Sequence, residues 1–133
     1  MALTKGVHHI AIKAKGAEAF EKLMHFYTQV LGMPVVRTWG EGDNAAAMVD
    51  IGGGSVMELF ANAPDELPQG AIRHIALATD DVDACVKAVR EAGYQITVEP
   101  NDIVIGSQPP FPARIAFCIG PCGEEVEFFC EAN

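Results

Sequence analysis

The sequence predicts an α+β fold made of two copies of one β-α-β-β-β module. The first observation is a repeat: His9-Ile-Ala-Ile recurs as His74-Ile-Ala-Leu, 65 residues later (74 − 9 = 65). The second is that an amphipathic helix pattern follows each copy of the motif. The third is that each half then continues with strand-like stretches and ends in a glycine-rich turn before a short apolar strand that carries one glutamate, Glu58 or Glu127.

The 133 residues suit one domain. We expect the first module at about residues 5–63, a linker at 64–70 that contains two prolines, and the second module at about 71–131. Because this linker is too short to separate independent domains, residues 1–133 are expected to form one domain whose halves share an architecture.

Each helix is predicted from apolar residues at helical spacing and from its boundary residues. The first stripe ends at Gly32, and the second begins after a cap at Asp80 or Asp81 and ends at Gly93. The first stripe consists of Phe20, Leu23, Met24, Tyr27, Val30 and Leu31, and the second of Val82, Cys85, Val86 and Val89.

Strand alternation separates the polar residues of the repeat from its aliphatic residues. His9 shares one face with Ala11 and Lys13, and His74 shares one face with two alanines. Each glutamate is likewise flanked by large apolar residues that point to the opposite face. An ionised carboxylate in such surroundings is costly to bury without a partner. If the two halves pair about a pseudo-twofold axis, two imidazoles and two carboxylates converge, and this set predicts a divalent metal site.

Composition excludes several classes of function. Nine basic and eighteen acidic residues give a net charge of −9, which argues against nucleic acid or an anionic membrane as a partner. No apolar run approaches the roughly 20 residues that span a bilayer. The first residues show no signal-peptide core, and the four cysteines lack CxxC spacing and are expected to be free thiols, so a cytoplasmic protein is predicted.

These motifs resemble the vicinal oxygen chelate superfamily, which includes glyoxalase I, methylmalonyl-CoA epimerase, extradiol dioxygenases, fosfomycin-resistance enzymes and bleomycin-resistance proteins. The resemblance covers nearly the whole chain. It rests on the two His-Ile-Ala motifs, on the segment Phe26-Tyr-Thr-Gln-Val-Leu-Gly-Met33, and on Val126-Glu-Phe-Phe129. It implies that the paired modules form an open, U-shaped mixed sheet around a metal.

The ligand order His9, Glu58, His74, Glu127 looks like that of glyoxalase I. The resemblance then implies a lyase or isomerase that converts a hemithioacetal of a 2-oxoaldehyde with glutathione, or another thiol, to a 2-hydroxyacyl thioester. Glu127 or Glu58 would move the proton of a metal-stabilised enediolate, and the metal would be Ni, Co, Mn, Fe or Zn. The alternatives are an acyl-CoA epimerase with a similar ligand set and a metal-free binding or resistance protein of the bleomycin-resistance type.

Substrate contacts are predicted less directly. Lys13 and Asn62 stand where glyoxalase I places an arginine and an asparagine that contact glutathione, and Arg37 is a further candidate anion contact. The substitution of lysine for arginine keeps the charge but loses the bidentate fork. Trp39, Met48 and Phe111 either line a substrate wall or pack in the core or at a dimer interface. A homodimer is expected, with the modules paired within one chain or exchanged between two.

Overall fold

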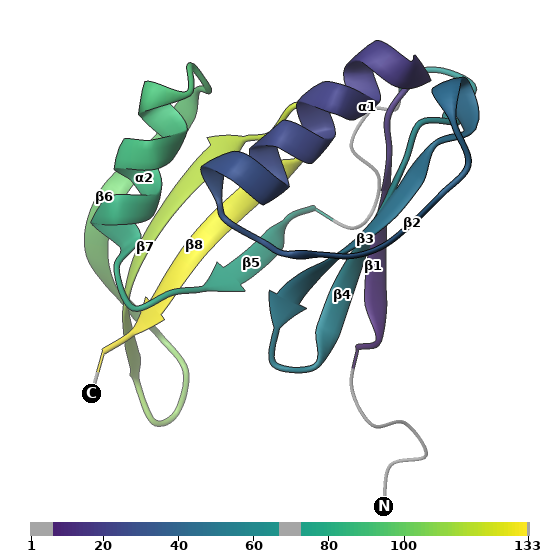
Figure 1. Cartoon of the computed structure of the whole chain (residues 1–133). Helices are drawn as coiled ribbons and strands as arrows, with labels where there is room; N and C mark the ends of the chain where they lie inside the picture. Colours follow the sequence, from purple (N-terminus) through teal and green to yellow (C-terminus); the bar gives the residue numbers. More distant parts are fainter. Residues whose placement is uncertain (1–6, 67–72, 133) are drawn as a thin grey trace, which may run out of the picture. The chain divides into compact units, whose positions relative to one another are not determined.

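The computed structural model describes residues 7–66 and 73–132 (Figure 1). The chain divides into two compact units, Met1–Leu67 and Pro68–Asn133. Each unit contains one four-stranded mixed sheet, and few helices accompany the strands. The predicted α+β fold class is therefore confirmed.

The first unit follows the predicted β-α-β-β-β order. Its sheet has the strand order β1-β4-β3-β2, in which β1 runs parallel to β4 and the other pairs are antiparallel. Its elements are β1 (His9–Lys13), α1 (Gly16–His25), the π-helix η1 (Phe26–Val30), β2 (Val35–Trp39), the 3₁₀ turn η2 (Gly42–Asn44), β3 (Ala46–Gly52) and β4 (Ser55–Phe60).

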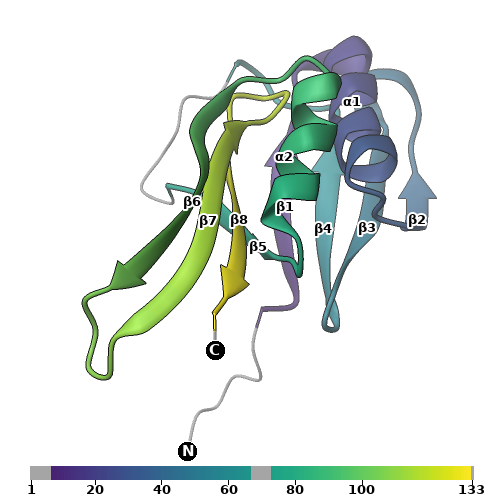
Figure 2. The same ribbon diagram turned by 90° about the vertical axis from the view of Figure 1, so that its left-hand side faces the viewer.

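The second unit repeats this topology. The strand order is β5-β8-β7-β6, again with a parallel first pair and antiparallel neighbours, and Figure 2 shows β6, β7 and β8 side by side. Its elements are β5 (Ile75–Ala78), α2 (Val82–Glu91), β6 (Ile96–Ile105), β7 (Phe111–Ile119) and β8 (Glu125–Glu131).

The core lies on the sheet faces that alternation predicted. Met57 and Leu59 flank Glu58 in β4 and are fully buried, and Val126 and Phe128 flank Glu127 in β8 in the same way. Alternate side chains of a strand point to opposite faces, so burial of these apolar residues directs both carboxylates to the other face.

The first helix ends differently from the predicted stripe. After α1 the chain widens into one π-helical turn, in which the Leu31 amide donates to the Phe26 carbonyl at 3.0 Å. This turn lets two consecutive residues, Phe26 and Tyr27, both reach full burial with their rings edge to face. The predicted stripe contained Tyr27 but not Phe26, which the structure adds to the buried residues of this turn.

The helices begin at caps of two kinds. The Asp81 side chain accepts a hydrogen bond from the Ala84 amide at 2.9 Å, so Asp81 rather than Asp80 caps α2. At α1 the capping carboxylate comes from a distant turn, because the Ala17 amide donates to Asp43 in η2 at 3.0 Å. Only the Asp81 cap of α2 is local in sequence.

Two prolines lie within strands of the second unit. Pro100 interrupts β6, which is an edge strand with a register shift between Val98 and Asn101. Pro112 belongs to β7, which begins at Phe111. Phe111 and Pro112 already pair with Ile105 and Val104 of β6, so the pairing of β7 starts ahead of Arg114.

All four cysteines are free thiols, as expected. Burial is the main cause that raises the pKa of Cys118 and of Cys122 to about 12. Both side chains therefore stay protonated at neutral pH and are poor nucleophiles. In the described part of the chain, no helix has the length and apolar character needed to cross a membrane.

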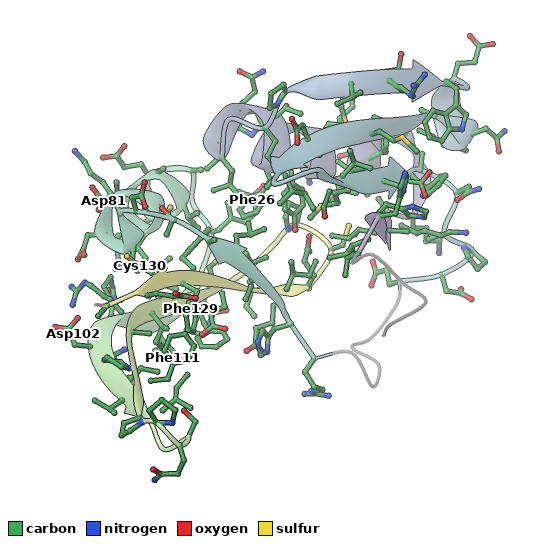
Figure 3. The ribbon with its side chains drawn as sticks, turned by 90° about the horizontal axis from the view of Figure 1, so that it is seen from below. Phe26, Asp81, Asp102, Phe111, Phe129 and Cys130 are labelled. Carbon is green, nitrogen blue, oxygen red and sulfur yellow. The ribbon has the colours of Figure 1, made fainter. Side chains whose placement is uncertain are left out.

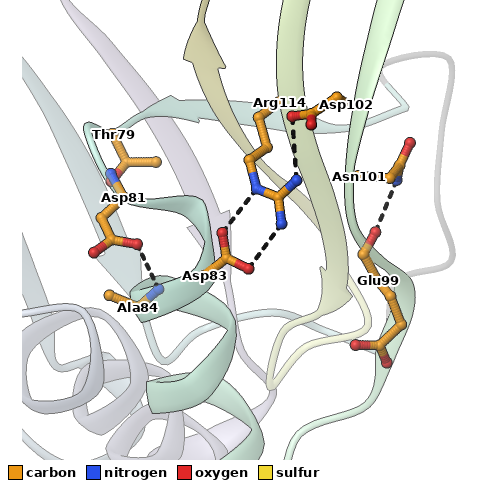
Figure 4. A network of polar contacts seen from close by, with 8 residues as sticks. All are labelled: Thr79, Asp81, Asp83, Ala84, Glu99, Asn101, Asp102 and Arg114. Carbon is orange, nitrogen blue, oxygen red and sulfur yellow. Dashed lines mark hydrogen bonds and ion pairs between the residues drawn. The ribbon is translucent and has the colours of Figure 1, made fainter.

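Polar contacts on the helix side of the second sheet tie α2 to β7 (Figure 4). Arg114 donates two hydrogen bonds to Asp83 of α2, at 2.7 and 2.9 Å, and a third to Asp102 of β6 at 3.1 Å. These hydrogen bonds from Arg114 lower the pKa of the Asp83 carboxyl.

We predict that Arg114→Gln raises the pKa of Asp83 toward its ordinary value of 3.8. The pKa of Asp83 is lower in the folded than in the unfolded protein. The Arg114–Asp83 hydrogen bonds therefore stabilise the fold fully at pH values above the unfolded-state pKa, and this stabilisation is lost as the pH falls through the folded-state pKa. Carboxyl NMR titration measures the shift, and Asp102→Asn is the control that leaves both Asp83 bonds in place. An unchanged titration of Asp83 in Arg114→Gln would contradict the assignment.

Candidate functional site

The first unit brings His9 and Glu58 together on one sheet face. β1 pairs in parallel with β4, with Ala11 opposite Glu58, and His9 lies two residues before Ala11 on the same face. The His9 Nε2 atom lies 2.7 Å from Glu58 Oε1. The His9 side chain is 43% exposed and the Glu58 side chain 14% exposed, so an exposed imidazole lies beside a largely buried carboxylate.

The second unit reproduces this pair in the same register. Ala76 of β5 lies opposite Glu127 of β8, and His74 lies two residues before Ala76. The His74 Nε2 atom lies 3.2 Å from Glu127 Oε1, with the imidazole 40% and the carboxylate 11% exposed. The sequence repeat is therefore also a repeat of side-chain geometry.

Burial disfavours the ionised form of the Glu127 carboxylate. Burial raises the pKa of Glu127, and the neighbouring His74 offsets this effect in part. An ionised carboxylate in this position favours a positive partner on its open side. A divalent cation is one such partner, and oxygen and imidazole nitrogen are common ligands of transition metals.

Imidazole nitrogen and carboxylate oxygen are suitable metal ligands, and each unit supplies one side chain of each kind. Within residues 7–66 and 73–132, no three histidine, cysteine, aspartate or glutamate side chains come together as a metal-binding group. Each unit presents one imidazole and one carboxylate, which is half of the predicted set of four. The four-ligand centre therefore stays a prediction that requires both pairs.

Strand register extends the face of the first pair toward β2. Glu58 lies opposite Met48 of β3, which lies opposite Arg37 of β2, so these three residues form one row on the same face. In the next row Lys13 lies opposite Phe60, and its ammonium lies 5.5 Å from the centre of the Phe60 ring. The face that carries His9 and Glu58 thus also carries two cations.

The same row ends in the single tryptophan of the chain. Trp39 pairs with Ala46, which pairs with Phe60, and the Trp39 and Phe60 rings meet edge to face at 6.0 Å. Trp39 is 42% exposed, so it contributes to the sheet face and not to the core. Asn62 is exposed just beyond β4 and forms an isolated bridge with Lys15.

The corresponding face of the second sheet is aromatic. Phe117 lies opposite Glu127, and its ring meets His74 edge to face at 5.4 Å. Phe111 lies farther along β7 on the same face, and Figure 3 shows it beside Phe129, with their ring centres 5.7 Å apart. This register places Phe111 on the face of the His74–Glu127 pair.

Two contacts of these pairs were missed by reasoning from sequence. Phe117 follows the alternation of β7, but its position beside Glu127 depends on the β7–β8 register, which no local pattern gives. Strand alternation, if it extended to His8, would place this residue on the face opposite His9. His8 precedes β1, where alternation does not hold, and its Nδ1 atom lies 3.0 Å from His9 Nδ1.

The comparisons with known proteins agree on one family. The family model described as the Glyoxalase/Bleomycin resistance protein/Dioxygenase superfamily matches residues 6–128. A lactoylglutathione lyase of Haemophilus influenzae is 31% identical over 115 residues, which cover 81% of this chain and 82% of the relative.

Solved structures show the same fold at lower identity. TnmS3, an antibiotic binding protein from Streptomyces sp. CB03234, has a TM-score of 0.69 at 20% identity and covers 99% of this chain and 100% of its own. A V278E mutant of glyoxalase I from Zea mays has a TM-score of 0.73 at 24% identity and covers 92% of this chain and 43% of its own.

We predict that His74 and Glu127 are energetically coupled in metal-free protein. In a double-mutant cycle with His74→Gln and Glu127→Gln, the coupling energy should be about 1 kcal/mol, because the two side chains are in contact and the carboxylate is largely buried. Urea unfolding in the presence of a chelator measures it.

The matched control pairs His74→Gln with Asp83→Asn. Asp83 is held by Arg114 on the helix side of the sheet, so these two changes should be additive. If the changes in the free energy of unfolding caused by His74→Gln and Glu127→Gln were additive, the 3.2 Å contact would contribute nothing to stability.

Proposed function

The chain belongs to the glyoxalase/bleomycin resistance protein/dioxygenase superfamily, and we propose that it is a metal-dependent lyase or isomerase of the glyoxalase I type. The substrate would be a hemithioacetal of a 2-oxoaldehyde with glutathione or another thiol. The product would be a 2-hydroxyacyl thioester.

One observation carries this proposal. The His9–Glu58 and His74–Glu127 pairs occupy the same register in two repeated sheets, each with an exposed imidazole beside a largely buried carboxylate. A structural role alone does not require the same polar pair twice. The relatives named lactoylglutathione lyase support the reaction type.

The proposed ligands are His9, Glu58, His74 and Glu127. Two imidazoles and two carboxylates suit Ni, Co, Mn, Fe or Zn in a site with open positions. When bound, such an ion supplies Lewis-acid polarisation of neighbouring substrate oxygens. The remaining chemistry is proton transfer, which the protein's own carboxylates provide.

We assign the proton transfer to Glu127, with Glu58 as the second candidate. Glu127 takes the proton from the substrate carbon that bears sulfur and returns it to the neighbouring carbon, while the hydroxyl proton passes between the two substrate oxygens. No oxidant or reductant is needed, since the reaction is an isomerisation. Glu127 is favoured because its contact with histidine is the longer one, 3.2 Å against 2.7 Å.

Lys13, Arg37 and Asn62 are the proposed substrate contacts. Lys13 and Arg37 share the face of the first pair, where they offset the surrounding negative charge for an anionic thiol. Asn62 lies beyond the same end of β4, two residues after Phe60, which is opposite Lys13. Trp39 and Phe60 add an apolar surface beside Lys13.

A binding protein is the second candidate. The fold shared with an antibiotic binding protein and the aromatic face around Phe117 favour it. Such a protein would hold no tightly bound metal and would keep its ligand in Glu127→Ala, so elemental analysis of purified protein separates the two classes.

An acyl-CoA epimerase would instead exchange deuterium at the 2-carbon of an acyl-CoA. A homodimer and a cytoplasmic location also stay predictions.

We predict that Glu127→Gln lowers kcat for thioester formation by about a hundredfold or more, because the amide cannot accept the proton. Absorbance of the thioester formed from methylglyoxal and glutathione measures the rate in protein loaded with each candidate metal in turn. Glu131→Gln, at the exposed end of the same strand, is the matched control and should be fully active. Absence of activity with every metal in the wild-type protein would refute the proposed reaction.

Lys13→Met should raise KM for the glutathione adduct about tenfold with a smaller change in kcat, because the ammonium contributes binding and not proton transfer. Lys13→Arg should restore most of the affinity, since it keeps the charge on the same face. Steady-state kinetics separates the two parameters. Lys87→Met, on the exposed side of α2 beside Glu91, removes the same charge elsewhere and should leave KM unchanged. An equal rise of KM in Lys87→Met would mean that net charge alone is responsible.

A further inference from the structure

His8 contacts the Nδ1 atom of His9, which is the ring nitrogen that does not face Glu58. The two Nδ1 atoms lie 3.0 Å apart, with the rings edge to face at 5.2 Å, while the Nε2 atom of His9 faces Glu58. We propose that His8 is a positioning residue that sets the tautomer and orientation of His9. The metal-linked part of this inference rests on the proposed function, whereas the tautomer of the metal-free protein does not.

The backbone holds His8 in this place although it precedes the strand. The Val56 amide donates to the His8 carbonyl at 3.0 Å, and the Ser55 hydroxyl donates to the Val7 carbonyl at 2.6 Å. The chain ahead of β1 is therefore tied to the start of β4, and the His8 ring stays beside His9. A terminal residue without such anchors would not keep a defined ring contact.

Hydrogen-bond complementarity fixes the tautomers in metal-free protein. A neutral imidazole carries one N–H and one lone pair, and a carboxylate only accepts. The nitrogen of His9 that faces Glu58 therefore carries the hydrogen, which leaves a lone pair on His9 Nδ1. The hydrogen between the two rings must then come from His8, so His8 carries its hydrogen on Nδ1.

Metal loading would reverse both tautomers. A histidine that ligates through Nε2 carries its hydrogen on Nδ1 and usually donates it to an outer partner, which orients the ring. His9 would then donate to His8 Nδ1, and His8 would move its own hydrogen to Nε2. His8 can serve both states because an imidazole nitrogen can donate or accept.

The second pair lacks this arrangement. Arg73 holds the position equivalent to His8, and a guanidinium has donors but no acceptor. The His74 ring lies beside Glu127 and meets the Phe117 ring edge to face. Arg73 therefore provides a matched control position that precedes the other histidine.

The first experiment reads the ring nitrogens by ¹⁵N NMR at about pH 8.5, above the ordinary titration range of imidazole. In metal-free protein we expect His8 with its hydrogen on Nδ1 and His9 with its hydrogen on Nε2. The exposed His25 in α1 is the internal reference. On addition of Zn²⁺ we expect both rings to change tautomer. A His8 with its hydrogen on Nε2 in metal-free protein would overturn the proposal.

The second experiment measures Zn²⁺ affinity by calorimetry. His8→Phe keeps an aromatic ring without nitrogen and should weaken binding about 10–100-fold, the usual effect of losing an outer partner. His8→Asn supplies a donor and an acceptor near Nδ1 and should recover most of the affinity, and Arg73→Gln should bind as the wild type does. Wild-type affinity in His8→Phe would refute the positioning role. If the wild-type protein binds no divalent metal, the proposed function fails, and the metal-free tautomers still decide whether the ring contact exists.

Discussion

The parallel pairing of the first and last strands of each module is the constraint on which the site depends. It sets Ala11 opposite Glu58 and Ala76 opposite Glu127, so that each histidine reaches diagonally to its carboxylate. Alanine is small enough to leave the space beside the carboxylate open. A parallel pair also needs a crossover, and in each module the helix and two strands between the paired strands provide it. The elements between the paired strands thus form the crossover that makes this register possible.

That register is protected by burial on the opposite face. In β4 the carboxylate stands between Met57 and Leu59, both fully buried, and a slip by one residue would turn Glu58 toward the core. Placing an unpaired ionised carboxylate there would cost on the order of several kcal/mol. Burial of the apolar residues that flank each glutamate therefore determines on which face of the sheet its carboxylate lies.

The difference between local periodicity and long-range pairing explains how much of the fold and the site could be predicted from the sequence. The repeat, the helix stripes and the faces of His9 and Glu58 follow from local periodicity, so they could be read without a structure. The cap on α1 by Asp43 and the contact of Phe117 with His74 depend on which distant segments meet, and no local pattern encodes that. The ring contact of His8 is not predictable for a different reason, because His8 precedes β1 and strand alternation does not extend to it.

The two modules keep the His–Glu pair and differ around it. The position equivalent to Lys13 is Ala78, because each lies four residues after its histidine, and both face a phenylalanine on the neighbouring strand. The row that runs from Glu58 through Met48 to Arg37 corresponds to the row from Glu127 through Phe117 to Val98. Cations in the first sheet are thus replaced by apolar side chains in the second. The His–Glu pair is therefore the polar feature that the two modules share on this face, whereas the positions of the two cations in the first sheet are taken by alanine and valine in the second.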